Sequence, residues 1–316
     1  MHDSTDGHGP RKAVIDIGSN SVLLVVAEWN GEDWNQIYES TEVTALGEGT
    51  KATGLLGEEG MASTLAALRT MFAKARELGA ARILAAATMA ARIATNTGEF
   101  LSRAEFQGTP AFVLSGEDEA ELGFHAVADD PMFSTYERIS IVDPGGQSTE
   151  LVTADRTYQG WRTLFRRSYP VGTLGLKSQM LGDESPSMGA VLSAAASIDD
   201  LIGLCYLPRQ SGCTVVLGAT GTNLVSLRDR LATWQPEIVH GAYLDFEDVS
   251  KAVGRMMPMT DAERRGLVGM EPGRERTIHI GALILERFLS AIGAPGCFVS
   301  VRGWRHALLA KESPMM

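Results

Sequence analysis

Two stretches of the chain share one pattern, and this pairing constrains the fold more than any other feature. In residues 13–29 (AVIDIGSNSVLLVVAEW) and again in 140–155 (SIVDPGGQSTELVTAD), an apolar strand delivers an aspartate, glycine and hydroxyl residues turn the chain, and a second apolar strand returns. One such hairpin is common, but two in the same order indicate a duplicated unit. We therefore expect two related domains, each built on one hairpin and facing each other across a cleft.

The two turns suit a phosphate group. Glycine lets the backbone approach an anion closely, and successive N–H groups in such a turn form a concave set of donors. We expect these donors to come from Gly18, Ser19, Asn20, Gly145, Gly146, Gln147 and Ser148. Asp16 and Asp143, at the ends of the first strands, are candidate ligands for the divalent cation that accompanies phosphate.

Strand-like and helix-like segments alternate along the rest of the chain, which predicts α/β layers. Helices are expected over 221–232 and 274–291. A further amphipathic helix is expected where apolar residues fall at helical spacing: Leu65, Leu68, Met71, Phe72 and Ala75. The first domain is expected over 11–130 and the second over 136–303, with turn residues near 128–138 between them. A terminal helix over 304–316 is expected to pack back on the first domain. A glycine turn before a helix at 217–222 (LGATGT) places Gly218, Gly221 and Thr222 where a helix N-terminus can hold another anion.

The composition is that of a water-soluble enzyme. The 316 residues are 44% hydrophobic and 21% charged, enough for two cores of ordinary size. Cys205, Cys213 and Cys297 are too scattered for a disulfide framework or a zinc site, which fits a reducing cytoplasm. The polar N-terminus lacks the apolar segment of an export signal, and no apolar run is long enough for a membrane span.

The acidic excess lies entirely in the first half. Residues 1–135 carry 9 Lys and Arg against 20 Asp and Glu, whereas residues 136–316 carry 19 of each. A polyanionic substrate is therefore expected to bind mainly to the second half. Arginines gather there at Arg162, Arg166, Arg167, Arg255, Arg264, Arg265, Arg274 and Arg276. Because neither half is net basic, we expect no nucleic-acid partner.

Five segments in order resemble one known family. They are DIGSNSVLLVV, SGEDEAEL at 115–122, VDPGGQSTEL at 142–151, YPVGTLGL at 169–176 and LGATGT. Together they resemble the exopolyphosphatase and guanosine pentaphosphate phosphatase (Ppx/GppA) family, from about Lys12 to about Leu309. The resemblance implies two actin-like (ribonuclease H-like) domains of the ATPase superfamily and hydrolysis of terminal phosphoanhydride bonds in polyphosphate or guanosine pentaphosphate.

The resemblance also assigns roles to residues. Glu119 matches the carboxylate held to be the catalytic base, and Glu150 matches one that contacts the metal or the attacking water. Asp143 and Asp16 would hold Mg²⁺ (or Mn²⁺). Arg92 matches an arginine that grips phosphate, a task suited to its planar fork of donors. The further family positions are Arg274, for phosphate, and His240, for which we expect a structural or substrate-orienting role.

Some residues depart from the family pattern. The departures are Leu23, Ala45, Gln147, Thr220, Val301 and Trp304, and Gln147 is the most serious because it replaces a glycine of the second turn. Gln147, Thr220 and Val301 leave open a catalytically weakened sensor that only binds phosphate or a nucleotide. A kinase of the same superfamily would use the same hairpins, but the Glu119 motif disfavours it. A homodimer is a candidate assembly.

Overall fold

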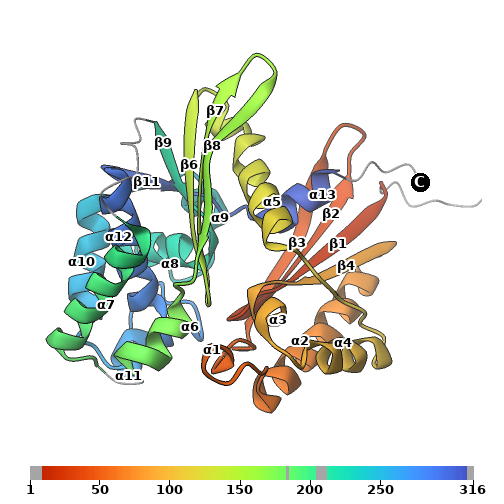
Figure 1. Ribbon diagram of the computed structural model, residues 1–316. Coiled ribbons are helices and arrows are strands. Elements are labelled where there is room, and N and C mark those ends of the chain that lie inside the picture. Colours follow the sequence, from red (N-terminus) through yellow and green to blue (C-terminus); the bar gives the residue numbers. More distant parts are fainter. Residues whose placement is uncertain (1–8, 183–184, 204–211, 312–316) are drawn as a thin grey trace, which may run out of the picture. The chain divides into compact units, whose positions relative to one another are not determined.

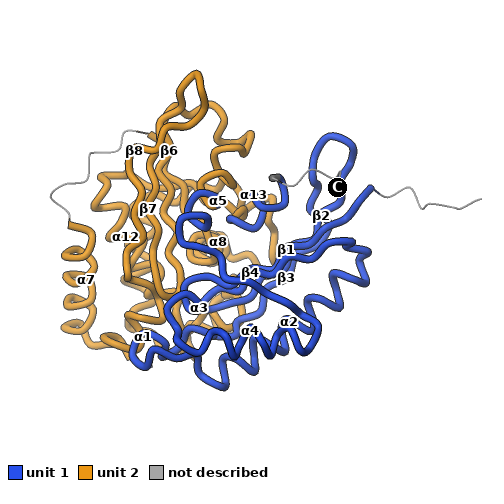
Figure 2. Tube along the Cα trace, turned by 45° about the vertical axis from the view of Figure 1, so that its right-hand side comes forward, with its two compact units in different colours: residues 1–122, 304–316 blue, residues 123–303 orange. Residues whose placement is uncertain are grey.

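The computed structural model describes residues 9–182, 185–203 and 212–311, which form two compact units (Figures 1 and 2). Unit 1 contains the described residues up to Leu122 together with the terminal helix from Trp304 on, and unit 2 contains those from Gly123 to Gly303. The division falls inside helix α5 (Gly116–Ala128), upstream of the expected 128–138 segment. Residues 1–8 of the polar N-terminus and Cys205 lie outside the described residues.

Unit 1 is built on a five-stranded sheet of order β3-β2-β1-β4-β5. The first three strands are antiparallel, and β4 and β5 continue the sheet parallel to β1. The strands are β1 (Arg11–Ile17), β2 (Ser21–Trp29), β3 (Trp34–Val43), β4 (Arg82–Ala87) and β5 (Phe112–Val113). The helices are α1 (Thr50–Thr53), α2 (Glu58–Glu77), α3 (Met89–Ile93), α4 (Thr97–Phe106), the start of α5, and α13 (Trp304–Lys311).

Unit 2 repeats this plan and adds one strand. Its sheet has the order β10-β11-β9-β6-β7-β8, in which β8, β7, β6, β9 and β11 correspond to the five strands of unit 1. The strands are β6 (Arg138–Pro144), β7 (Thr149–Thr157), β8 (Gly160–Tyr169), β9 (Cys213–Val216), β10 (Tyr243–Asp245) and β11 (Gly296–Val299). The longer helices are α7 (Met188–Ile202), α8 (Gly218–Arg228), α10 (Phe246–Met256) and α12 (Ile278–Ile292).

Short helical segments complete unit 2. They are η1 (Pro131–Phe133), α6 (Thr173–Leu176), the π-helix η2 (Lys177–Leu181), α9 (Pro236–Val239), α11 (Asp261–Arg265) and the 3₁₀ turn η3 (Arg274–Arg276). Among the helices within the described ranges, none is both long enough and apolar enough to cross a membrane.

The two hairpins match residue for residue. Asp16 pairs with Leu23 across β1 and β2, and Asp143 pairs with Glu150 across β6 and β7, so each aspartate stands at the same distance from its turn. At the open ends, an ion pair joins β1 to β2 (Arg11 with Glu28) and another joins β6 to β7 (Arg138 with Asp155). Register shifts also recur in matching places, after Val26 and after Thr153. The predicted duplication is confirmed in strand order, register and irregularities.

Each unit has its own apolar core, which the helices cover. In unit 1, α2 packs on β1 and β2 through the predicted helical stripe, which is buried: Leu65, Leu68, Met71, Phe72 and Ala75. Helix α13 also contacts β1 and β2 (Figure 1). In unit 2, α12 packs against α7, α8 and α10 and supplies much of the core. Burying apolar side chains of this size contributes about 1.5–3 kcal/mol each.

Three local predictions were wrong. Helix α8 begins at Gly218 instead of Gly221, because Gly218 takes a left-handed backbone (φ 74°) that turns the chain straight from β9 into the helix. The expected helix over 274–291 is a 3₁₀ turn followed by α12 from Ile278. Strand β10 was missed because only three residues form it, and it pairs with a strand far along the chain, β11.

A buried carboxylate fixes the segment that follows α5. Asp130 is 3% exposed, and one of its oxygens lies 3.2 Å from both His240 Nε2 and Arg302 Nε. Its other oxygen accepts the Met132 amide at 3.0 Å. Burial alone would raise the pKa of Asp130, but the hydrogen bonds from His240 and Met132 and the charge of Arg302 outweigh it and lower the pKa. His240 therefore contacts a buried carboxylate, which is consistent with the structural one of its two expected roles.

This cluster predicts a pH-dependent contribution to stability. Because the pKa of Asp130 is lowered in the folded state, its stabilising effect is present above the unfolded value near 3.8 and is lost as pH falls through the folded value. Asp130→Asn should lower the free energy of unfolding at pH 7 by about 1–3 kcal/mol, and the deficit should shrink below about pH 4. Urea unfolding at several pH values measures this, with the exposed neighbour Asp129→Asn as control. If the loss in free energy of unfolding does not change with pH, the shape of the Asp130 side chain, not its charge, is what stabilises the fold.

Candidate active site

The first glycine turn is closed by one backbone hydrogen bond and held from outside by others. The Gly18 amide donates to the Ser21 carbonyl at 2.9 Å. A Cβ on Gly18 would lie 2.9 Å from that same carbonyl, so the turn requires glycine for close approach. The segment after β3 donates to two more carbonyls of the turn: the Gly47 amide donates to the Ser19 carbonyl at 2.8 Å, and the Ala45 amide donates to the Asn20 carbonyl at 3.0 Å.

The second turn has the same construction. The Gly145 amide donates to the Ser148 carbonyl at 2.8 Å, and a Cβ on Gly145 would lie 3.0 Å from that oxygen. The Thr173 amide donates to the Gly145 carbonyl at 3.0 Å, and the Leu174 amide donates to the Gly146 carbonyl at 2.8 Å. Gly172 packs so tightly here that a Cβ would come within 2.5 Å of the turn backbone. The motif YPVGTLGL therefore serves to hold this turn.

In each turn three carbonyls accept backbone hydrogen bonds while amides remain available. Within the described part of the chain, no backbone or side-chain acceptor receives the amides of Ser19, Asn20, Gly146 or Ser148. Neighbouring amides left without acceptors form a site for an anion. Each unit thus carries one turn with the donor arrangement expected for phosphate.

Beside the first turn lies the partly buried carboxylate of Asp16. Asp16 Oδ1 is buried and accepts no hydrogen bond from the described residues. Burial raises the pKa of Asp16 to about 7, and the negative charge of Glu119 adds to the rise. The positive charge of Arg305 and a hydrogen bond from the Trp304 side chain oppose it. An uncompensated buried carboxylate is costly, which makes Asp16 a natural ligand for a cation.

Arg92 and Glu119 form a direct ion pair in unit 1. Arg92 Nη1 lies 2.6 Å from Glu119 Oε2 and also donates to the Leu114 carbonyl at 3.0 Å. The other terminal nitrogen, Nη2, meets only the weak acceptor Met89 Sδ, at 3.6 Å. Glu119 stands in the first turn of α5, where Ser115 accepts the Asp118 amide at 3.1 Å. Burial raises the pKa of Glu119, although the charge and hydrogen bond of Arg92 oppose the rise.

In unit 2 the corresponding carboxylates are Asp143 and Glu150, which face each other across β6 and β7. Glu150 accepts a hydrogen bond from the Ser168 hydroxyl at 2.7 Å, and Ser168 stands opposite it on β8. Asp143 reaches the start of α8, where a Cβ on Gly218 would lie 3.0 Å from its Oδ1. The position of Gly218 is therefore set both by its left-handed backbone and by the aspartate beside it.

The other two residues assigned to the third turn have packing explanations. A Cβ on Gly221 would lie 2.5 Å from the Val216 side chain, so this glycine allows α8 to pack on the sheet. The Thr222 hydroxyl donates back to the Ala219 carbonyl of its own helix at 3.4 Å. The departure Thr220 fits against Gly281, where a Cβ would come within 2.5 Å of the threonine hydroxyl. Their roles in phosphate binding stay predictions.

Gln147 and Arg274 are the remaining assigned residues. Gln147 is 2% exposed, and its backbone is not among those with positive φ, so a side chain is tolerated at this point of the turn. Arg274 lies in η3, is 11% exposed, and its Nε is 3.5 Å from Glu271 Oε2. The structure thus brings Asp16, Arg92 and Glu119 together in unit 1 and Asp143, Glu150 and Gly218 together in unit 2.

The carboxylates fit a magnesium ion that keeps most of its own water. Within the described ranges, no three His, Cys, Asp or Glu side chains gather into a metal cage. Mg²⁺ usually binds through one or two carboxylates plus water and substrate phosphates, so a cage is not required. The buried Asp16 Oδ1, which no donor satisfies, is the observation that favours such an ion.

The terminal helix supplies two residues near this site that the sequence did not assign. Trp304 hydrogen-bonds to Asp16, and the Arg305 charge lowers the Asp16 pKa. Arg305 also lies 4.0 Å from Glu39 on β3. Trp304 had been noted only as a departure from the family pattern. An indole N–H can only donate, and so it complements a carboxylate.

The sheet order, with three antiparallel strands followed by parallel ones in both units, is that of the actin-like, ribonuclease H-like superfamily. Residues 24–315 match the Ppx/GppA phosphatase family, and the chain belongs to it.

Individual relatives agree with this assignment. The chain is 28% identical to Exopolyphosphatase 2 of Mycobacterium tuberculosis over 289 residues, 87% of this chain and 89% of the relative. It is 28% identical to the Ppx/GppA family member of Aquifex aeolicus, whose crystal structure superposes with a TM-score of 0.76 and covers 95% of this chain and 96% of that one. An exopolyphosphatase structure from Cytophaga hutchinsonii shares the fold at 19% identity, with a TM-score of 0.83 over 95% of this chain and 96% of that one.

The burial of Asp16 predicts that an amide in its place stabilises the metal-free protein. The raised pKa means that Asp16 favours the folded state fully below the unfolded value of 3.8 and loses this effect as pH rises through about 7. Asp16→Asn should therefore have a higher free energy of unfolding than wild type. The gain should grow by up to about 1.4 kcal/mol for each pH unit between 3.8 and about 7 and should be clearest at pH 8.

Thermal unfolding in the presence of a chelator at pH 5 and pH 8 measures this gain. The exposed Asp33→Asn is the control, and it should leave the unfolding midpoint unchanged at both pH values. An Asp16→Asn protein that is less stable than wild type at pH 8 would contradict the electrostatic account.

Proposed function

We propose that the protein is a magnesium-dependent (or manganese-dependent) hydrolase of terminal phosphoanhydride bonds. Its substrate is inorganic polyphosphate, with the 5′ phosphate of guanosine pentaphosphate as the alternative. Two amide-lined turns with their carbonyls engaged support the proposal most directly, because they offer donors to phosphoryl oxygens without the cost of rearranging. The Exopolyphosphatase 2 relative supports the choice of polyphosphate.

In the proposed reaction the protein binds, orients and accepts a proton. The amides of Ser19, Asn20, Gly146 and Ser148 bind phosphoryl oxygens. A water oxygen forms a bond to the terminal phosphorus, the bridging P–O bond breaks, and its electron pair leaves with the shortened chain. Glu119 accepts a proton from the water, and the raised pKa of its carboxylate suits that task. A bound Mg²⁺ supplies positive charge to the phosphoryl oxygens.

Arg92 has two roles in this scheme. Its Nη1 holds Glu119 in place, and its Nη2, which has only a sulfur acceptor, is the donor that can reach a phosphoryl oxygen. A guanidinium suits both tasks because its donors form a fixed planar fork. Lysine at this position would offer a single ammonium group and could not keep the two contacts in the same geometry.

Some of the departures that suggested a sensor have a structural explanation. Thr220 packs against Gly281, and Trp304 hydrogen-bonds to Asp16, so these departures fit their own surroundings. The backbone at Gln147 does not need glycine. The carboxylates expected to do the chemistry are all present, and we therefore propose catalysis over binding alone.

A substitution at Glu119 tests the proposal. Glu119→Gln should reduce phosphate release by about two to four orders of magnitude because general-base catalysis contributes that much, while KM changes little. Phosphate release is measured from polyphosphate and from guanosine pentaphosphate side by side, with and without Mg²⁺. Glu117→Gln is the matched control, since Glu117 is an exposed acid two residues earlier on the same helix.

The outcomes separate the alternatives. Loss of turnover in Glu119→Gln but not in Glu117→Gln supports the base assignment, and the faster substrate identifies the preference. Wild-type protein that binds polyphosphate but releases no phosphate with Mg²⁺ or Mn²⁺ would instead be the sensor.

A further inference from the structure

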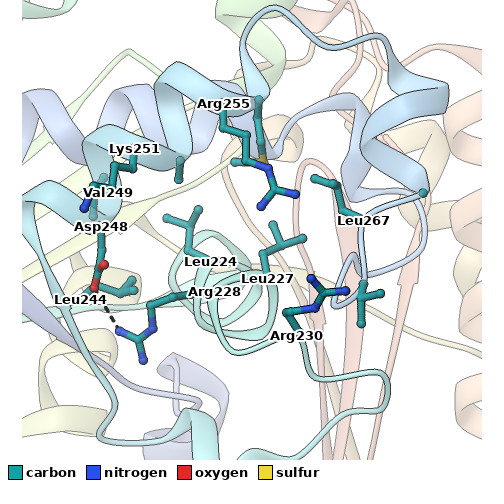
Figure 3. A pocket seen from close by; sticks show the side chains of 14 residues that line it. Leu224, Leu227, Arg228, Arg230, Leu244, Asp248, Val249, Lys251, Arg255 and Leu267 are labelled. Atoms are coloured by element: carbon teal, nitrogen blue, oxygen red, sulfur yellow. Dashed lines mark hydrogen bonds and ion pairs between the residues drawn. The ribbon is translucent and has the colours of Figure 1, made fainter.

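A second concave site lies in unit 2, away from the glycine turns. Its cavity of about 440 Å³ falls in the range of small-molecule pockets (Figure 3). Residues of α8, α10, β10 and the loops that follow α8 and α11 surround it. Helix α8 runs between the two sites. Gly218, at its start, lies beside Asp143, and Arg228, at its end, lines the cavity about 15 Å along the helix.

The lining of the cavity is aliphatic. Leu224, Leu244, Val249 and Met256 are each at most 3% exposed and form its floor, whereas Leu227, Ala252, Leu267 and Val268 present the apolar surface that a ligand can reach. Among the described residues that line it, none is aromatic. A flat base or ring would find no stacking partner here, whereas a flexible alkyl chain would find a surface of matching character.

The rim is strongly basic, and two of its cations have no partner. Arg228 pairs with Asp248 at 3.2 Å, and Lys251 pairs with Glu247 at 2.8 Å. Arg230 and Arg255 make no hydrogen bond or ion pair with any described residue. In Figure 3 their guanidinium groups point toward each other from opposite sides of the opening. Two converging guanidiniums are the donors that a carboxylate or phosphate head requires.

The backbone at Arg230 adds a second observation. Arg230 follows α8 with φ 57°, one of two non-glycine residues with positive φ in the described ranges. The Leu231 amide donates to the Ser226 carbonyl at 2.9 Å, so Arg230 occupies the helix-ending position that glycine or asparagine usually fills. An arginine there accepts backbone strain and places its side chain over the cavity.

We propose that this cavity binds an amphiphilic anion, an aliphatic chain that ends in a carboxylate or phosphate. The chain lies on Leu227, Ala252, Leu267 and Val268, and the head is held between Arg230 and Arg255. The proposal is independent of the hydrolytic function, since none of these residues belongs to the candidate active site.

Isothermal titration of the full chain tests the proposal, with decanoate and decyl phosphate as probes below their micelle concentrations. Decyl phosphate has one more alkyl carbon than decanoate, so its affinity is compared with that of undecanoate, and the difference identifies the preferred anion. Affinity should rise about fourfold for each added methylene from hexanoate to decanoate. Decanol, which lacks the charge, should bind at least tenfold more weakly.

Variants locate the site. Arg230→Gln/Arg255→Gln should weaken decanoate binding at least tenfold, whereas Lys251→Gln should change it less than threefold, because Lys251 lies on the same rim but is already paired. Unchanged unfolding midpoints would show that the variants fold. Val268→Trp, at a 43% exposed rim position, offers a second test by blocking the opening.

Three results would overturn the proposal. They are absence of binding by both ten-carbon probes, affinity that does not depend on chain length, and decanoate binding that survives the double arginine variant. A fourth contrary result would be displacement of bound decanoate by inorganic phosphate as effectively as by decyl phosphate, which would indicate a plain anion site.

Discussion

The structure depends above all on how the two glycine turns are hydrogen-bonded. In each, one amide donates to the carbonyl three residues on, and a neighbouring segment donates to two further carbonyls of the turn. Because the acceptors are used internally, the amides that remain are an uncompensated row of donors. Folding therefore fixes these donors before any ligand arrives, and we propose them as the phosphate-binding groups. The tight contacts at Gly18, Gly145 and Gly172 show why these positions lack a Cβ.

The carboxylates of unit 1 complement these donors. Asp16 and Glu119 are both partly buried, and each has a raised pKa. Arg92, Arg305 and Trp304 partly offset that cost. A folded protein keeps such groups where charge is useful for function, and here they lie beside donors suited to phosphate. Unit 2 offers the matching pair Asp143 and Glu150, with α8 beginning beside Asp143.

The sequence predicted the parts that depend on local pattern. The hairpins, the aspartate beside each turn and the α2 stripe follow from strand and helix periodicity, and the structure has all three. It could not predict the ion pair between Arg92 and Glu119, since spacing along the chain does not report a contact between α3 and α5. It also missed the contact of Trp304 with Asp16, which joins residues at opposite ends of the chain. The departure at Trp304 was the one available signal.

The central claim is that the free amides of both turns bind phosphate. Amide chemical shifts of isotopically labelled protein, followed while tripolyphosphate is added with Mg²⁺, test it most directly. The account predicts the largest saturable shifts at Ser19, Asn20, Gly146 and Ser148, with little change at the internally bonded amides of Gly18 and Gly145. Saturable binding without shifts at those four amides would contradict it.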